Sequence, residues 1–264
     1  MRRDNRRRAW TVCLVPSLVV AVVVGGILVG AGSALVGLVV FVALSVVGPI
    51  ALWSASPGLV VRSLGARRCS AGEHERLLNL VDGLCATLGL PPPAVAVVDS
   101  TTPNALTVGR SPDDAVLVVT SGLASGLSLV QLEGVLAHEL VHVKRHDMVV
   151  SGPAATAAAL CSVAVGTGRA SELVHRIVGP GREFAADQRA ALVVRYPPGL
   201  EGALETMAGA RSGEWPPARG RLVAVSRWLW IDPRPTTRSP SGAAPVGDGG
   251  LDDTAVRAAA LALR

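Results

Sequence analysis

The chain has 264 residues, half of them hydrophobic, and a formal net charge of +5 at pH 7. This length suits one domain of good size with appendages, but the apolar share is higher than ordinary soluble enzymes carry. The composition therefore argues against a wholly soluble protein and predicts that part of the chain lies in a lipid bilayer.

A transmembrane hairpin is predicted near the N-terminus. The stretch from Trp10 to Trp53 contains no charged residue and is interrupted only by Gly-Ala-Gly-Ser near its middle. Its halves, 11–30 and 35–53, each approach the ~20 residues that a helix needs to cross hydrocarbon. A cleaved signal peptide is the alternative, but its apolar core should end after about 7 to 15 residues, and this one continues.

Arginines flank this predicted hairpin on both sides. They are Arg2, Arg3, Arg6, Arg7 and Arg8 before it, and Arg62, Arg67 and Arg68 after it. Under the positive-inside rule both flanks lie in the cytoplasm, which predicts a multi-pass protein of the cell membrane with its main domain cytoplasmic. Because the arginines are explained as topology signals and no basic patch with interleaved aromatics occurs elsewhere, no nucleic-acid partner is expected.

The next segments predict a helix followed by a small sheet. Apolar residues at three-and-four spacing in "ERLLNLVDGLCATL" indicate an amphipathic helix that ends before the proline run at 91–93. The β-branched runs "AVAVVDS" and "AVLVVTS" lie on either side of turn-forming residues and indicate strands. The predicted fold class is therefore mainly α with a small β-sheet, an α+β fold.

A second long helix begins at Ser128, where Ser128 and Gln131 form the pattern of a capping box. The apolar segment 148–166 follows it, and Gly-Pro-Gly at 179–181 precedes a further helix that begins with "REFAAD". Together these patterns divide the chain into predicted regions: a basic cytoplasmic N-terminus 1–10, a transmembrane hairpin 11–53, a main domain 62–232, a flexible linker 233–250, and a C-terminal helix 251–264.

The run "HELVH" within this helix predicts a metal site. Residues four apart lie on one helical face, about 6 Å apart along the axis, so His138 and His142 can converge on one zinc ion. Glu139 then lies beside the metal, where a carboxylate can take a proton from a zinc-activated water. The alternatives are a chance match and two buried core histidines; burying this polar stripe without a metal or partners would be costly.

A catalytic zinc also needs a third protein ligand. His146 would lie about 12 Å along the axis from His138, too far to share the ion. Glu183 in "REFAAD" is the better candidate, because a glutamate on a separate helix can approach the metal from the side.

Three motifs in order, "LPPPAVAVVDSTTPNALTVGR", "HELVHVKRHD" and "EFAAD", resemble the HtpX-like membrane zinc metallopeptidases, the family that includes the CAAX prenyl endopeptidases. The resemblance runs from about residue 73 to residue 209 and implies a zincin-like metallopeptidase domain behind the hairpin. It implies that His138, His142 and Glu183 bind one zinc ion and that Glu139 is the general base.

Two further roles follow from the same resemblance. Asp187 matches the aspartate of the family's ExxxD pattern and is expected to orient a metal ligand from behind. Asn104 matches an asparagine beside the active-site strand and is a candidate donor to substrate or to the developing oxyanion. The alternative for Asn104 is a simple turn residue.

The sequence also departs from the family. Relatives usually carry a histidine near the C-terminal helix that helps to stabilise the transition state, but this chain has none after His175. Trp215 or Asp248 occupies that place, so the enzyme is expected to be slower or to use another donor such as an arginine. Segment 148–166 replaces two further spans of the typical relative, and we expect it to be buried, membrane-skimming or re-entrant.

The predicted function is a membrane-bound zinc endopeptidase that hydrolyses peptide bonds of protein substrates, with quality control of membrane proteins as a possible role. The chain is too short to build the large chamber of the prenyl-processing branch. The competing hypothesis is a membrane-anchored, catalytically weak or inactive regulator that keeps the metal site. A cytoplasmic hydrolase of small amides is a third idea, which the hairpin disfavours.

Overall fold

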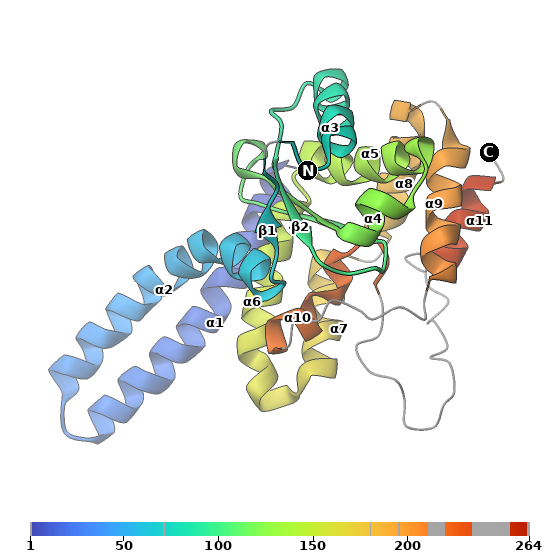
Figure 1. Ribbon diagram of the computed structural model, residues 1–264. Coiled ribbons are helices and arrows are strands. Elements are labelled where there is room, and N and C mark those ends of the chain that lie inside the picture. Colours follow the sequence, from blue (N-terminus) through green and yellow to red (C-terminus); the bar gives the residue numbers. More distant parts are fainter. Residues whose placement is uncertain are drawn as a thin grey trace, which may run out of the picture.

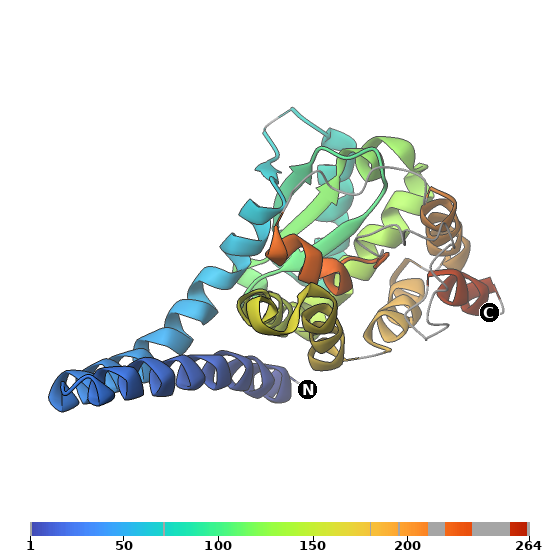
Figure 2. The ribbon, with the colours of Figure 1, turned by 90° about the horizontal axis from the view of Figure 1, so that it is seen from below.

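The computed structural model describes residues 2–70, 72–179, 181–194, 196–210, 220–233 and 254–262. In these residues the chain is mainly helical with one four-stranded sheet, so the predicted fold class is confirmed. Two long helices protrude from a body that contains the sheet and the other helices (Figure 1). The view from below shows the same separation of hairpin and body (Figure 2).

The protruding hairpin consists of α1 (Arg2–Gly30) and α2 (Ala34–Ser63). The two backbones approach closely where a Cβ on Gly37 would lie 2.8 Å from the carbonyl oxygen of Gly25, as small residues permit in membrane helix pairs. Large apolar side chains cover its outer surface, with Leu35 75% exposed. Such a surface is suited to lipid rather than to water.

Both helices extend beyond the predicted spans. Hydropathy marks only the apolar stretch, whereas α1 already begins among the N-terminal arginines and α2 continues to Ser63. Ala9 is completely buried, and the Trp10 and Trp53 rings stack with centroids 5.4 Å apart. The ends of α1 and α2 that lie outside the hydrophobic segment pack against the body, and this packing stabilises their helical conformation.

The body begins with a short β1 and a helix, which three further strands and a short helix follow. Its first elements are β1 (Arg67–Arg68), α3 (Glu75–Leu88), β2 (Ala94–Val98), β3 (Ala105–Val108), the 3-10 turn η1 (Pro112–Asp114), β4 (Val116–Thr120) and α4 (Ser121–Gly126). The strand order is β1-β2-β4-β3, with β2 parallel to β4 and the other pairs antiparallel. This order places β3 at one edge of the sheet.

Alternating side chains of the strands enter two separate cores. In β3, Ala105 belongs to the cluster that contains the apolar residues of α3 and α5 (Leu129–Arg145), whereas Leu106 belongs to the cluster on the other face, which includes residues of α6. This follows from the two-residue period of a strand. Thr107 shares the parity of Ala105 and therefore faces α5.

A second helical hairpin returns the chain to the site. It consists of α6 (Met148–Val165) and α7 (Thr167–Val178), and α6 packs against α1, α2 and α7. By length and composition α6 could cross a membrane, as could α1 and α2, but two thirds of its apolar window is buried in the protein. Because α7 brings the chain back, α8 (Arg182–Val194) lies beside α5. This arrangement agrees with the expectation that segment 148–166 is buried or re-entrant and does not carry α8 to the far side of a membrane.

The remaining elements surround α5 and α8. They are α9 (Pro197–Gly209), α10 (Arg221–Val225), the 3-10 turn η2 (Ser226–Leu229) and α11 (Thr254–Ala262). The last of these lies within the segment predicted as a C-terminal helix and packs on α9 and α8. The predicted linker 233–250, apart from Pro233, lies outside the described residues.

Candidate metal centre

The two motif histidines lie on α5, whose start and end are set locally. At its N-terminus the Ser128 hydroxyl accepts a hydrogen bond from the Gln131 amide, and the Gln131 side chain accepts one from the Ser128 amide, so the predicted capping box is confirmed. The helix ends at His146, which has a left-handed backbone with φ 59°. This conformation turns the chain before Asp147.

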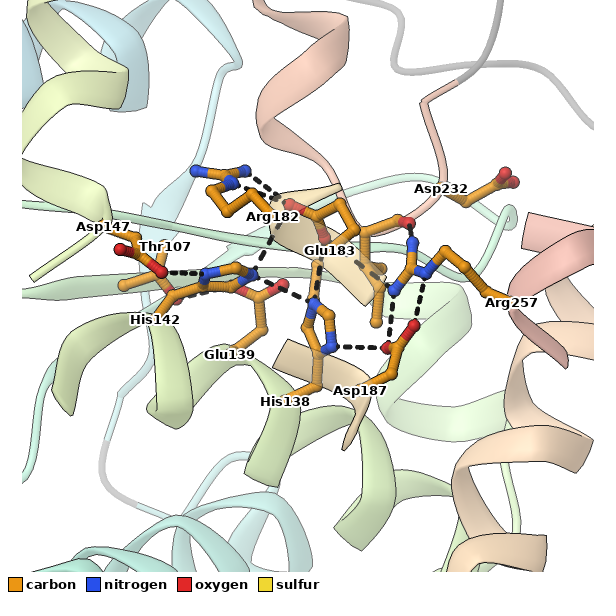
Figure 3. A network of polar contacts seen from close by, with 12 residues as sticks. Thr107, His138, Glu139, His142, Asp147, Arg182, Glu183, Asp187, Asp232 and Arg257 are labelled. Carbon is orange, nitrogen blue, oxygen red and sulfur yellow. Dashed lines mark hydrogen bonds and ion pairs between the residues drawn. The ribbon is translucent and has the colours of Figure 1, made fainter. Parts of the chain in front are cut away.

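His138 and His142 point to one another from successive turns of α5 (Figure 3). Their Nε2 atoms are 3.1 Å apart, and both residues are buried. Glu183, in the first turn of α8, places Oε2 3.0 Å from His138 Nε2 and Oε1 3.5 Å from His142 Nε2. The structure therefore brings together the three side chains predicted as ligands, and this group could hold a metal ion.

Asp187 supports His138 from behind. Its Oδ1 lies 2.8 Å from His138 Nδ1, the ring nitrogen opposite the one that faces Glu183. Glu183 and Asp187 are four residues apart on α8, so one helical face carries both carboxylates. A carboxylate beside Nδ1 favours the proton on that nitrogen, which leaves Nε2 free for a metal.

Asp147 plays the matching part for His142, and sequence reasoning missed it. Its Oδ2 lies 3.3 Å from His142 Nδ1, while Arg145 Nε donates to the same oxygen at 2.8 Å. The side-chain amide of Asn5, on α1, donates to its other oxygen at 3.0 Å. The available signal was an acid directly after the helix that carries the histidines, but the contact depends on the turn at His146.

Glu139 does not join the three converging side chains. Thr107, on β3, donates its hydroxyl hydrogen bond to Glu139 Oε2 at 2.7 Å, and both residues are buried. Sequence reasoning had not selected Thr107. The sequence signal for Thr107 was the alternation of side chains along β3, which turns Thr107 toward α5. Only the position of the sheet on α5 decides which residue of that helix Thr107 contacts.

Asn104 is directed elsewhere. Its side-chain amide donates to the carbonyl of Asp232, and its side-chain oxygen accepts from the backbone amides of Asp232 and Ala105. All of these bonds are buried. The structure thus gives Asn104 the role of joining the start of β3 to residues 231–232, and it does not bring this side chain to the histidines, in contrast to the expected donor to substrate.

Two arginines lie against the acidic groups of the site. Arg182 donates from Nε and Nη2 to Glu183 Oε1 at 2.9 and 2.6 Å. Arg257, completely buried in α11, binds Asp187 through two nitrogens at 2.6 and 2.8 Å and lies 3.8 Å from Glu183. The C-terminal helix thus contributes to the site, which no local sequence pattern indicated. The positions of Trp215 and Asp248 lie outside the described residues.

These contacts set the charges of the site. Burial alone would lower the pKa of His138, but Asp187 and Glu183 outweigh it and raise the pKa to about 9. Burial would raise the pKa of Glu183, yet Arg182 and the two histidines hold it well below its usual range. Burial would likewise raise the pKa of Asp147, but its bond with His142 and the nearby arginines lower it to about 2. Glu183 and Asp147 are therefore ionised at neutral pH.

Comparison with known proteins identifies peptidases as relatives of this chain. The model of peptidase family M48 matches residues 72–195. The chain is 33% identical over 221 residues to a protease HtpX homolog of Salinibacter ruber, covering 76% of this chain and 79% of that protein. A protease HtpX homolog of Dictyoglomus thermophilum is 31% identical over 235 residues, 77% of each chain. No solved structure was found to match.

Proposed function

This chain belongs to the HtpX-like peptidases of family M48 and is a membrane metalloprotease, and we propose that it is a zinc-dependent endopeptidase. His138, His142 and Glu183 would hold the ion, and Glu139 would be the general base. The observation that carries the proposal is the convergence of the three buried ligand atoms.

The spacing of these atoms suits zinc. Ligand atoms about 2.0 to 2.1 Å from a tetrahedral zinc ion stand about 3.3 Å from one another. The Nε2 atoms of the histidines are 3.1 Å apart, and the Glu183 oxygens lie 3.0 and 3.5 Å from them. Two imidazoles and one carboxylate are also a donor set that catalytic zinc uses, with a fourth position left for water.

The chain's own residues would divide the work as follows. Bound zinc supplies Lewis acidity, which makes water a stronger acid and polarises the scissile carbonyl. Asp187 and Asp147 hold the two imidazoles at Nδ1, and thereby orient both Nε2 atoms. Thr107 holds one oxygen of Glu139, so that Oε1 would receive the proton from the attacking water and later pass it to the leaving amine.

Substrate would lie extended along the edge of β3 from Thr107 onward, because the backbone amide of Ile231 already donates to the carbonyl of Ala105 at 2.9 Å. The backbone carbonyl of Asn104 accepts a hydrogen bond from the backbone amide of Thr120 in β4. Because hydrogen-bonding direction alternates along a strand, the odd-numbered residues of β3, including Thr107, direct their backbone groups away from β4. A peptide paired there would pass beside Glu139, because the Thr107 side chain contacts Glu139. Backbone pairing gives affinity with little sequence preference, which suits unfolded protein substrates.

The test compares purified full-length protein in detergent on an unfolded substrate such as casein. We expect wild type to cleave it, Glu139→Gln to lose roughly 10²-fold or more of kcat, and a chelator to stop cleavage. Glu139→Gln should still bind one zinc ion per chain, measured by elemental analysis. Glu133→Gln, the same change on the same helix, serves as the matched control and should cleave as wild type does.

The outcomes also separate the competing hypothesis of a membrane-anchored regulator. Stoichiometric zinc with no cleavage by wild type would reject the endopeptidase and favour the regulator. Equal cleavage by wild type and Glu139→Gln would leave metalloproteolysis possible but exclude Glu139 as its base.

A further inference from the structure

A cavity of about 220 Å³ lies where the hairpin meets the catalytic body. Its lining comes from three places: the start of α1, the turn between α5 and α6, and the turn between α7 and α8. Three arginines, Arg8, Arg145 and Arg182, face one acid, Asp147, in this lining. Its volume is several times the ~30 Å³ that a water molecule occupies in the liquid, so a phosphate group fits.

The acid of this cavity already has several hydrogen-bond partners. Asp147 accepts from Asn5 and from Arg145 Nε, and it lies beside His142. The bond from Arg145 uses Nε alone, whereas a guanidinium carries five N–H donors. Arg182 is occupied by Glu183 and Ser151. Arg8 and Arg145 are therefore the groups that would hold an anion here.

The cavity lies at the depth of lipid headgroups. The uncharged stretch of α1 begins directly after Arg8, and the stacked pair Trp10 and Trp53 marks the edge of the apolar surface, because tryptophan gathers at the membrane–water interface. Arg8 precedes Trp10 by two residues, about 3 Å along the helix axis toward water. A phosphate of the surrounding lipid would thus reach the cavity without leaving the headgroup layer.

We propose that this cavity binds the phosphate group of an anionic phospholipid through Arg8 and Arg145. The position favours a lipid over a free phosphate, since the acyl chains could lie along the exposed apolar surface of α1, where Val15, seven residues after Arg8 and on the same helical face, is 55% exposed. The bound headgroup would join α1 to the turn that carries Asp147, and Asp147 in turn contacts His142. The lipid would therefore hold the anchor against the metal centre.

The test measures lipid binding directly and does not depend on proteolysis. Full-length protein in a neutral detergent is titrated with short-chain phosphatidylglycerol, with the matching phosphatidylcholine, or with inorganic phosphate, and bound ligands are counted by native mass spectrometry. We expect one phosphatidylglycerol to bind more tightly than either other ligand. Arg8→Gln should weaken it about fivefold, the contribution of one arginine near an anionic surface.

Arg7→Gln is the matched control, because it removes the same charge from the neighbouring position, which is exposed and absent from the cavity lining. It should bind phosphatidylglycerol as wild type does, and Arg8→Lys should retain most of the affinity. Equal weakening by Arg7→Gln and Arg8→Gln would show diffuse attraction to the basic N-terminus and overturn the site. Equal binding of both lipids, or inorganic phosphate binding as tightly as the lipid, would overturn it as well.

Discussion

At the scale of single residues, two short contacts determine how the proposed base and one proposed ligand behave. Thr107 holds Glu139 by a buried hydrogen bond of 2.7 Å, and Asp187 holds His138 at 2.8 Å. Neither supporting group needs to touch substrate or metal, so both act by positioning. Their effects can be measured separately from the loss of a ligand or of the base.

Thr107→Val should lower kcat roughly tenfold with little change in KM, because Glu139 loses the hydrogen bond that the Thr107 hydroxyl donates and with it a fixed orientation. Thr107→Ser keeps the hydroxyl and should recover most of the rate. Steady-state kinetics and zinc content of both variants provide the check. A serine variant as slow as the valine variant would show that packing, and not the hydroxyl, matters.

Zinc affinity should rise with pH. The His138 pKa of about 9 in the metal-free protein means that His138 carries a proton at pH 6 to 8. Zinc must displace that proton, so its affinity should increase up to about tenfold per pH unit and level off above pH 9. Competition with a chromophoric chelator at pH 6, 7 and 8 measures the slope, and a pH-independent affinity over this range would contradict the prediction.

At the scale of elements, the site depends on how closely helices pack around α5. Gly134 lies where α5 crosses α9, and a Cβ there would stand 2.7 Å from the backbone nitrogen of Leu200. Backbone atoms of a packed helix cannot relieve a steric clash by a rotamer change, as a flexible side chain can. The glycine therefore permits an approach that any other residue would prevent.

Gly134→Ala should destabilise the protein by about 1 to 3 kcal/mol through this overpacking. Gly83→Ala is the control: Gly83 lies inside α3, is exposed, and a Cβ there meets nothing within 4 Å. It should stabilise by about 0.4 to 1 kcal/mol, because alanine loses less backbone entropy on folding. Thermal unfolding in detergent compares the pair, and a shift of the same sign in both would refute the packing argument.

The return of α7 is the other decisive feature at this scale. Without it the 18 residues of α6 would carry Glu183 away from the histidines. Because α6 and α7 form a hairpin, Glu183 comes within 3.0 Å of a histidine 45 positions earlier in the chain. The same return places Gly179 and Arg182 in the wall of the cavity beside α1.

At the scale of the whole molecule, the hairpin and the catalytic body share an interface. Asn5 reaches Asp147, and the first residues of α1 lie beside the metal centre and on the side opposite the hairpin tip. The N-terminus and the catalytic body are therefore on the same side of any membrane that the hairpin spans. Because arginines flank the hairpin at both ends, we propose from the positive-inside rule that this side is the cytoplasm.

This orientation can be tested by cysteine labelling in intact cells. In a chain whose four cysteines are replaced, a membrane-impermeant maleimide should label Gly32→Cys, at the tip of the hairpin, and leave Arg7→Cys unlabelled until the cells are opened. Labelling of Arg7→Cys in intact cells, with Gly32→Cys protected, would reverse the proposed topology.

Local patterns were sufficient for part of this structure. The capping box at Ser128 and the uncharged stretch from Trp10 to Trp53 depend on neighbours along the chain, and the structure has helices there. His138 and His142 share a face because a helix repeats every 3.6 residues. The fold class followed from the same periodicities. The role of the histidines and Glu183 as zinc ligands stays a prediction until metal binding is measured.

Sequence by itself thus predicted most of the long helices, the two inner strands of the sheet, the family and the three side chains that converge on one point, because these depend on short-range periodicity and on motif. It missed β3, which lies within the segment 101–114 that was interpreted as turn-forming. Only the tertiary structure decided what surrounds that point. Thr107, Asp147 and Arg257 reach the site through the sheet's position, a left-handed turn and a distant helix. It also turned Asn104 toward residues 231–232. Thr107 and Arg257 reach the site by packing between segments that are remote in the chain, and Asp147 by a backbone turn, so no local sequence pattern encodes these contacts.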